Sequence, residues 1–406
     1  MIMKTSRLIS LFTLIVLLAS CVKEGELCEQ QIQKNLQVMV DSMLTNYKLK
    51  YPGYPGGLAL KVVSKKGSYF VSTGMGAGIT DQIHFRAASN SKTFTSAAIL
   101  LLAQEGKLNI DARITDTIPG TTMTYFPLDK NYKIPFRNKI TIRQLLQHIA
   151  GVWDVSNEVI PDTISADVPY KGQNYLDYVL KSEPAHTFTF DELVEVVATC
   201  ELYYSRPGKA HHYSNTGYSI LGKIIERISG KSYSQFVTER IIVPMGLTGS
   251  SLPFSGDDQL LPAPYAKGYY YSPDILECTK SNLSANVAEG TLITTPENLV
   301  RFLRNLLRGE GVLTSYWINN VMLAAPEIPA DAGNYACGIF YAPNLGYGHN
   351  GAHEGYLSRM VSDPNSDITI VTFSNAWNIT DEKDTIIEQM TFLLDEGCYK
   401  AKYIVQ

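Results

Sequence analysis

The chain has 406 residues, of which 45% are hydrophobic and 18% charged, a composition that excludes general disorder and allows one large domain or two ordinary ones. Its formal net charge is −4 and it contains no long basic run, which argues against nucleic acid as the main partner. We therefore expect a folded chain with a substantial hydrophobic core.

The first twenty residues have the pattern of a signal peptide. Lys4 and Arg7 give a positive start, and Leu8 to Leu18 form an apolar run that is too short to span a bilayer. Small residues and Cys21 follow this run. We therefore expect residues 1–20 to be a cleaved leader that is not part of the fold.

The end of this leader, Leu-Ala-Ser-Cys at residues 18–21, resembles a bacterial lipobox. That resemblance implies cleavage before Cys21 and attachment of lipid to its sulfur, which would anchor residues 21–28 to a membrane surface. We expect a lipoprotein of the bacterial cell envelope, on the periplasmic or the outer surface. An uncleaved anchor and an ordinary secretory signal are the alternatives.

Five cysteines lie beyond the leader, and none of them forms a Cys-x-x-Cys pair, so we expect no structural zinc site. An exported chain can hold disulfides. Cys28 opens the first helix of the mature chain and Cys398 closes the last, so the two would meet if these helices pack antiparallel. A Cys28–Cys398 disulfide is the resulting hypothesis. The remaining three are expected to be buried and unpaired: Cys200, Cys278 and Cys337.

The pattern of apolar residues predicts the elements in chain order. We expect helices at 29–47, 92–104, 140–148, 190–199, 217–229, 232–242, 295–308 and 381–396, and strands at 58–63, 68–72, 337–341, 356–363 and 367–374. The polar residues 154–186 are typical of an insertion or a lid. Strands thus lie towards both chain ends. This predicts one catalytic unit at 29–400, with an α/β lobe of about 29–88 and 285–400 and an inserted helical lobe of about 89–284.

Ser89 and Lys92 form a Ser-x-x-Lys spacing at the start of the helix expected at 92–104. Residues three apart share a helix face, so the two side chains would point the same way. A serine hydroxyl is a weak nucleophile until a neighbour takes its proton, and a desolvated lysine one turn away is a suitable neighbour. The alternative is a helix-capping serine beside an exposed lysine.

Tyr213 and Asn215 stand in a short polar loop before the helix expected at 217–229. A tyrosine whose pKa is lowered by nearby cations can act as a general base. An asparagine amide offers a donor and an acceptor to a substrate amide. The alternative is an Asn helix cap preceded by a packing tyrosine.

A third segment, Gly348 to Tyr356, is rich in glycine and histidine. Its glycines, including Gly351, allow a ligand to approach the backbone closely. His349 could donate a proton or contact a carboxylate. A glycine-rich turn with a surface histidine is the alternative. His353 and Glu354 lack a second histidine at zincin spacing, and we expect no metal site and no cofactor.

The order Ser-x-x-Lys, Tyr-x-Asn and His-x-Gly resembles that of the penicillin-recognising serine hydrolases, in the branch of class C β-lactamases, serine D-Ala-D-Ala carboxypeptidases and related esterases. The resemblance implies a β-lactamase/transpeptidase-like α/β (α+β) fold, with an antiparallel sheet flanked by helices and an inserted all-helical lobe. It implies that Ser89 forms an acyl-enzyme and that Lys92 and Tyr213 share the proton work. It also implies that Asn215 holds the substrate amide, and that the N–H groups of Ser89 and Ala352 form the oxyanion hole.

One departure bears on the substrate, because many relatives carry Lys-Thr-Gly where this chain has His349, Asn350 and Gly351. Histidine is only partly charged near neutrality, so efficient β-lactam hydrolysis is not expected. We expect a D-Ala-D-Ala carboxypeptidase, D-peptidase or esterase that acts on a small peptide, ester or cell-wall-type substrate. The alternatives are a β-lactamase proper and a non-catalytic envelope binding or sensor protein. The sequence does not indicate an oligomeric state.

Overall fold

The computed structural model describes residues 5–272, 274–326, 335–380 and 382–406, and for 5–27 and 382–384 it describes the backbone alone. Its centre is a six-stranded sheet in the order β2-β1-β10-β9-β8-β7. All neighbouring strands in it are antiparallel. The strands are β1 (Leu58–Ser64), β2 (Gly67–Thr73), β7 (Phe340–Ala342), β8 (Gly346–His353), β9 (Tyr356–Asp363) and β10 (Ile368–Ser374). The expected antiparallel sheet built from both chain ends is confirmed.

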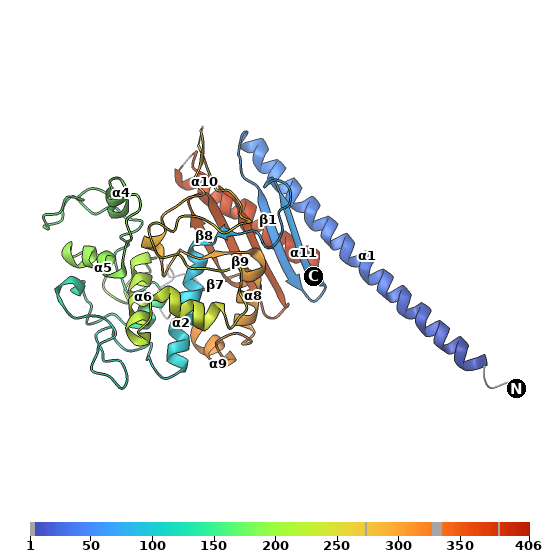
Figure 1. Cartoon of the computed structure of the whole chain (residues 1–406), viewed down its shortest axis with the longest axis horizontal. Helices are drawn as coiled ribbons and strands as arrows, with labels where there is room; N and C mark the ends of the chain where they lie inside the picture. Colours follow the sequence, from blue (N-terminus) through green and yellow to red (C-terminus); the bar gives the residue numbers. More distant parts are fainter. Residues whose placement is uncertain (1–4, 273, 327–334, 381) are drawn as a thin grey trace.

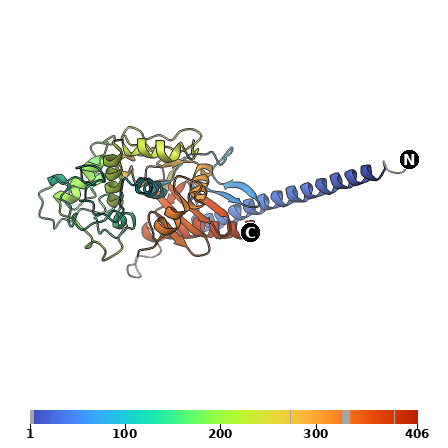
Figure 2. The ribbon, with the colours of Figure 1, turned by 90° about the horizontal axis from the view of Figure 1, so that it is seen from below.

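Helices cover both faces of this sheet (Figure 1). Helix α1 (Thr5–Lys50) lies on β2 and beside α11 (Glu396–Val405), and α8 (Pro296–Leu307) packs on β1, β9 and β10 from the other side. The apolar residues that predicted the first helix are buried: Ile32, Leu36, Val40, Met43 and Leu44. In Figure 2 the N-terminal part of α1 projects beyond the rest of the chain.

The second lobe is mainly helical and stands beside the sheet (Figure 2). Its helices are α2 (Ser91–Gln104), α3 (Ile142–Leu146), α4 (Tyr175–Leu180), α5 (Phe190–Thr199), α6 (Asn215–Ser229) and α7 (Tyr233–Val237). One hairpin within the expected helical range departs from that prediction. Its strands β4 (Tyr269–Tyr271) and β5 (Ile275–Glu277) form a small sheet with β11 (Ala376–Asn378).

Four further elements connect these parts of the fold. Strand β3 (Phe85–Arg86) pairs with β6 (Ile293–Thr294) and ties the chain before α2 to the chain before α8. The elements α9 (Ser315–Trp317) and α10 (Glu382–Gln389) precede β7 and α11. Thr295 caps α8 by accepting a hydrogen bond from the Asn298 N–H, and Pro296 stands in the first turn, where its missing N–H costs no hydrogen bond.

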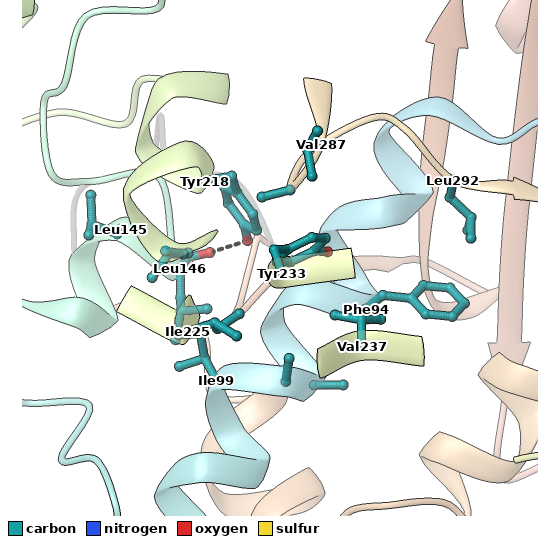
Figure 3. Close-up of a cluster of buried hydrophobic side chains, with 14 of the residues drawn as sticks. Phe94, Ile99, Leu145, Leu146, Tyr218, Ile225, Tyr233, Val237, Val287 and Leu292 are labelled. Atoms are coloured by element: carbon teal, nitrogen blue, oxygen red, sulfur yellow. Dashed lines mark hydrogen bonds between the residues drawn. The ribbon is translucent and has the colours of Figure 1, made fainter. Parts of the chain in front are cut away.

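Helix α2 is buried on all sides, from Ser91 to Ala103. Its second half is apolar all round, as is expected of a helix in a core. Phe94 stacks on Phe302 of α8 with ring centroids 3.6 Å apart. Figure 3 shows side chains from α2, α6 and α7 in one cluster, with the Tyr218 hydroxyl donating to the Leu146 carbonyl at 2.9 Å. This packing fixes the start of α2 rigidly.

The predicted Cys28–Cys398 disulfide is wrong, because both cysteines are free. Helices α1 and α11 do lie side by side. However, Cys28 is exposed, whereas Cys398 is buried and its Sγ lies 3.7 Å from Thr372 Oγ1 on β10. The Cys28 side chain therefore faces solvent, whereas the Cys398 side chain faces the core. Cys200, Cys278 and Cys337 are buried and free, as expected.

Candidate active site

Ser89 lies in a short 3-10 turn, Ala88–Asn90, that leads into α2. Ala88 has a φ of +49°, a left-handed conformation that is uncommon for a residue with a side chain. Asn90 Nδ2 donates to Ala87 O at 2.7 Å and to Ser358 Oγ on β9 at 2.8 Å, which ties the turn to the sheet. The residue before α2 is Asn90 and not Ser89, so the capping interpretation of Ser89 is wrong.

Lys92 is fully buried one turn along α2, so it is not the exposed lysine of that alternative interpretation. Its Nζ donates to Ser89 Oγ at 3.1 Å and to Asn215 Oδ1 at 2.7 Å. Two more acceptors belong to Glu289, whose carbonyl oxygen lies at 3.0 Å and whose Oε2 lies at 3.1 Å. Three of these four oxygens belong to carbonyl or carboxylate groups, which matches the three hydrogens of an ammonium group.

The electrostatics of this buried pair agree with the geometry. Burial lowers the pKa of Lys92, but the Tyr213 and Glu289 side chains outweigh that effect and leave it raised. Burial also raises the pKa of Glu289, and the Lys92 charge opposes this only in part. Lys92 is therefore an ammonium at neutral pH in the resting site.

Tyr213 lies over Lys92, with Nζ 4.7 Å from the centre of its ring, and its hydroxyl interacts with both Lys92 and Ser89. A general base would need a lowered pKa, and Lys92 does act in that direction on Tyr213. Burial raises the pKa of Tyr213 by more than Lys92 lowers it. Tyr213 is therefore a neutral phenol at rest, which can donate a proton but is not a ready base.

The Tyr213–Asn215 loop is held by a neighbour that the sequence did not indicate. Ser214 caps α6 by accepting from the Gly217 N–H, so the interpretation of Asn215 as the cap is wrong. The Ser214 N–H donates to His148 Nδ1 at 3.1 Å, and the His148 ring lies 4.2 Å from the Tyr213 ring. His148 thus helps to position Tyr213 through the backbone of the next residue and through contact between the two rings.

His349 does not occupy the role that the sequence suggested. It is buried on β8, and its Nδ1 lies 2.6 Å from the Asn350 carbonyl oxygen, which can only accept, so Nδ1 carries the hydrogen. Its Nε2 then accepts from the Tyr335 hydroxyl at 2.9 Å. Burial and the Lys92 charge lower the pKa of His349 to about 3. The imidazole is neutral and both of its nitrogens are engaged, so it offers no positive charge to a substrate carboxylate.

The cavity above Ser89 has a volume of about 950 Å³, within the usual range for small-molecule sites. Strand β8 contributes Asn350 and Ala352 to its wall, and its last residue, His353, also lines the cavity, whereas His349 is not among the lining residues. Alternate residues of a strand point to opposite faces, which explains this separation. The expected insertion also lines the cavity, through Ser156, Asn157, Asn174, Leu176, Asp177, Leu180 and Pro184.

Gly351 brings β8 against the nucleophile turn. A Cβ at this position would lie 2.1 Å from the Ala87 carbonyl oxygen, a backbone atom that cannot rotate away. Strand β7 pairs only with residues 346–348 of β8, so the backbone from His349 to His353 has no partner strand on that side among the described residues. An extended substrate segment can pair with such an open edge.

The structure therefore brings Ser89, Lys92, Tyr213 and Asn215 together and places Ala352 on the same cavity. Sequence reasoning missed Glu289, His148 and Tyr335. Glu289 is 197 positions from Lys92, so no local spacing could reveal the pair. Within the described residues, no group of three or more His, Cys, Asp or Glu side chains is arranged to hold a metal ion.

Comparison with known proteins identifies the family of the chain. The family model described as Beta-lactamase matches residues 52–390. The chain is 28% identical to Protein flp of Staphylococcus aureus (strain NCTC 8325 / PS 47) over 54% of its own length, but that match spans only 39% of Protein flp. It is 25% identical to penicillin-binding protein 4* of Bacillus subtilis (strain 168), over 76% of this chain and 64% of that protein.

Two solved structures have the same fold. The D-stereospecific amidohydrolase from Streptomyces sp. is 22% identical with a TM-score of 0.69, over 88% of this chain and 98% of that one. The D-amino acid amidase from Ochrobactrum anthropi SV3, complexed with L-phenylalanine amide, is also 22% identical with a TM-score of 0.69. The match covers 92% of this chain and 98% of the amidase chain. Since the family model matches most of the chain, the protein belongs to the Beta-lactamase family, a fold family of serine hydrolases.

Proposed function

We propose that the protein is a serine hydrolase that opens an amide or ester by forming an acyl-enzyme on Ser89. The observation that carries this proposal is the contact of Lys92 Nζ with Ser89 Oγ at 3.1 Å, beside Tyr213, on the floor of a large cavity. A serine hydroxyl held by a buried lysine and a tyrosine lies beside groups that can exchange protons with it during acylation. No cofactor is needed for this chemistry.

Each neighbouring group has a role in the proposed reaction. The Ser89 oxygen attacks the substrate carbonyl, and the N–H groups of Ser89 and Ala352 receive the developing oxyanion. Asn215 Oδ1 is occupied by Lys92, so its Nδ2 is the group that can donate to a carbonyl oxygen on the acyl side of the substrate. Tyr213 donates a proton to the leaving group, and water then releases the acyl group.

The cavity walls favour a substrate without a carboxylate beside the scissile bond. His349 is neutral and engaged with Tyr335, and Lys280 is the one lysine or arginine among the described lining residues. A β-lactam or a C-terminal D-Ala carboxylate would therefore meet no cation at position 349. We infer that D-amino-acid amides, D-peptides and esters are better substrates than penicillins. The similarity in fold to a D-amino acid amidase supports this inference.

A turnover panel tests the proposal. Purified protein is offered D-phenylalanine amide, a D-Ala-D-Ala peptide, nitrophenyl esters and nitrocefin, with the Ser89→Ala variant beside it. We expect turnover of an amide or ester that Ser89→Ala abolishes, and weak or no turnover of nitrocefin. Equal activity of the two proteins would contradict the role of Ser89. Efficient nitrocefin hydrolysis would instead support the β-lactamase alternative.

We also propose that Cys21 carries lipid and anchors the protein in the bacterial cell envelope. The lipobox-like sequence at 18–21 supports this. Within the described part of the chain, no helix combines the length and the apolar character needed to cross a membrane. Metabolic labelling with an alkyne fatty acid should mark the wild-type protein and not Cys21→Ser. Equal labelling of both would contradict the anchor.

A further inference from the structure

Among its described residues, the resting site lacks a base that can accept the Ser89 proton. The two side chains expected to take the Ser89 proton are both protonated, since Lys92 is an ammonium surrounded by four acceptors and Tyr213 is a neutral phenol. An ammonium cannot accept a proton. Acylation therefore requires a group that first removes one proton from Lys92.

Glu289 is the carboxylate placed for that transfer. Its Oε2 is 3.1 Å from Lys92 Nζ, and its side chain is 3% exposed. Asn286 Nδ2 donates to the other oxygen, Oε1, which leaves Oε2 directed at the lysine. Glu289 also lines the cavity, so a bound substrate would shield the pair from water.

We propose that Glu289 is the proton partner of Lys92: it forms an ion pair with the ammonium at rest and takes its proton when substrate binds. This proposal rests on the proposed acyl-enzyme function and adds a positioning residue to it. In the first step an N–H bond of Lys92 breaks and an O–H bond forms on Glu289, so the ion pair becomes neutral. In the second step the Ser89 O–H breaks, its proton moves to the Lys92 amine, and the Ser89 oxygen bonds to the substrate carbonyl carbon.

Substrate binding favours the first step for a physical reason. A desolvated ion pair loses more solvation than a neutral amine and carboxylic acid, so excluding water shifts the pair towards its neutral form. The raised pKa of the buried Glu289 carboxyl agrees with this role. The proton stays inside the site, so no proton has to be released to solvent before acylation.

The other titratable groups around Lys92 do not provide such a partner. His148 and His349 have their pKa lowered by burial and by Lys92, and both are neutral. Asp154 senses the Lys92 charge, but its carboxylate accepts from the Ser156 N–H and from Asn157 Nδ2. The Tyr213 hydroxyl interacts with Lys92, but a neutral phenol does not take a proton from an ammonium. Tyr218 lies with its ring near Nζ. Among the described residues, Glu289 is the carboxylate that forms an ion pair with Lys92.

The test is the pH dependence of Ser89 labelling by a fluorophosphonate probe in the full-length protein, with Glu289→Gln as the variant. In the wild type we expect a nearly flat rate across the neutral range. In Glu289→Gln the ammonium must lose its proton to solvent, so the rate at neutral pH should fall roughly 100-fold and rise about tenfold per pH unit. Thermal melting establishes that the variant is folded.

Two further variants make the result decisive. Glu289→Asp retains a carboxylate and should keep a flat profile at an intermediate rate, which a variant that only disturbs packing would not do. Asp154→Asn makes the same chemical change at a carboxylate without a direct contact and should keep the shape of the wild-type profile. If Glu289→Gln does not fold, a steeply pH-dependent rate in Glu289→Asp would overturn the proposal, and a flat rate would support it.

The remaining outcomes separate this inference from the proposed function. A wild-type protein that the probe does not label would overturn the acyl-enzyme function and this inference with it. A labelled wild type together with a Glu289→Gln variant of unchanged rate and profile would overturn the role of Glu289 alone. A uniform loss at every pH would assign Glu289 a purely structural role.

Discussion

His349 provides a prediction whose size follows from the structure. Its pKa is lowered to about 3 by burial and by the Lys92 charge, whereas a histidine in the unfolded chain titrates near 6.5. The pKa of His349 is lower in the folded state than in the unfolded state, so between these two values the unfolded state binds a proton that the native state does not bind. The contribution of neutral His349 to the free energy of unfolding is therefore fully present above the unfolded pKa. It is lost progressively as the pH falls from there towards 3.

The magnitude follows from this linkage. Each pH unit below about 6.5 lowers the free energy of unfolding by about 1.4 kcal/mol for this one group. At about pH 5 the loss is 1.5 units, or about 2 kcal/mol, relative to about pH 7.5. His349→Gln removes the titrating group and keeps a polar side chain that can accept from Tyr335.

Urea unfolding of both proteins at the two pH values measures the effect. We expect the difference between the wild type and His349→Gln to change by about 2 kcal/mol between about pH 7.5 and pH 5, with the variant less sensitive to acid. His353, whose pKa burial lowers to about 4, is present in both proteins and cancels. An identical acid sensitivity of the two proteins would refute the conclusion that His349 is held neutral.

Three further predictions follow from the same contacts. Tyr213→Phe should lower acylation about 100-fold or more, measured as kcat/KM on an ester, because the hydroxyl beside Ser89 is lost; a near-normal kcat/KM would contradict the shared proton role. Tyr335→Phe leaves His349 Nε2 buried without a donor and should cost about 1–3 kcal/mol in urea unfolding, and an unchanged midpoint would count against the bond. Gly351→Ala should destabilise the fold strongly in thermal melting, because its Cβ meets the Ala87 carbonyl oxygen at 2.1 Å. Gly217→Ala is its matched control: a Cβ there meets only ordinary contacts at 3.7 Å or more in a helix, so its melting temperature should be unchanged or higher.

The fold and the candidate site residues could be predicted from the sequence where the signal was local. Ser89 and Lys92 lie three residues apart at the start of α2, and Tyr213 and Asn215 lie at the start of α6. Each spacing alone left a structural alternative open, and the order of the three motifs carried the family resemblance. The antiparallel sheet followed from apolar strands near both chain ends. Strand β8 was not predicted, because its glycines disfavour a strand, although their missing Cβ atoms are what allows β8 to pack on β9 and the nucleophile turn.

The errors concern contacts that depend on the tertiary structure. The role expected for His349 failed because strand alternation directs Asn350 and Ala352 to the cavity and leaves His349 against Tyr335. The condition for Tyr213 to act as a base, a lowered pKa, is not met at rest because burial outweighs a single nearby cation. The role of Glu289 depends on a distance across the fold that no sequence pattern encodes.

The central claim is that Ser89 is the acylated nucleophile, and peptide mapping by mass spectrometry tests it most directly. The protein is treated with a fluorophosphonate, digested and sequenced. We predict a single modified peptide that carries the phosphonyl group on Ser89 and is absent from Ser89→Ala. A protein that remains unmodified, or one modified at another residue while Ser89 stays free, would contradict the account.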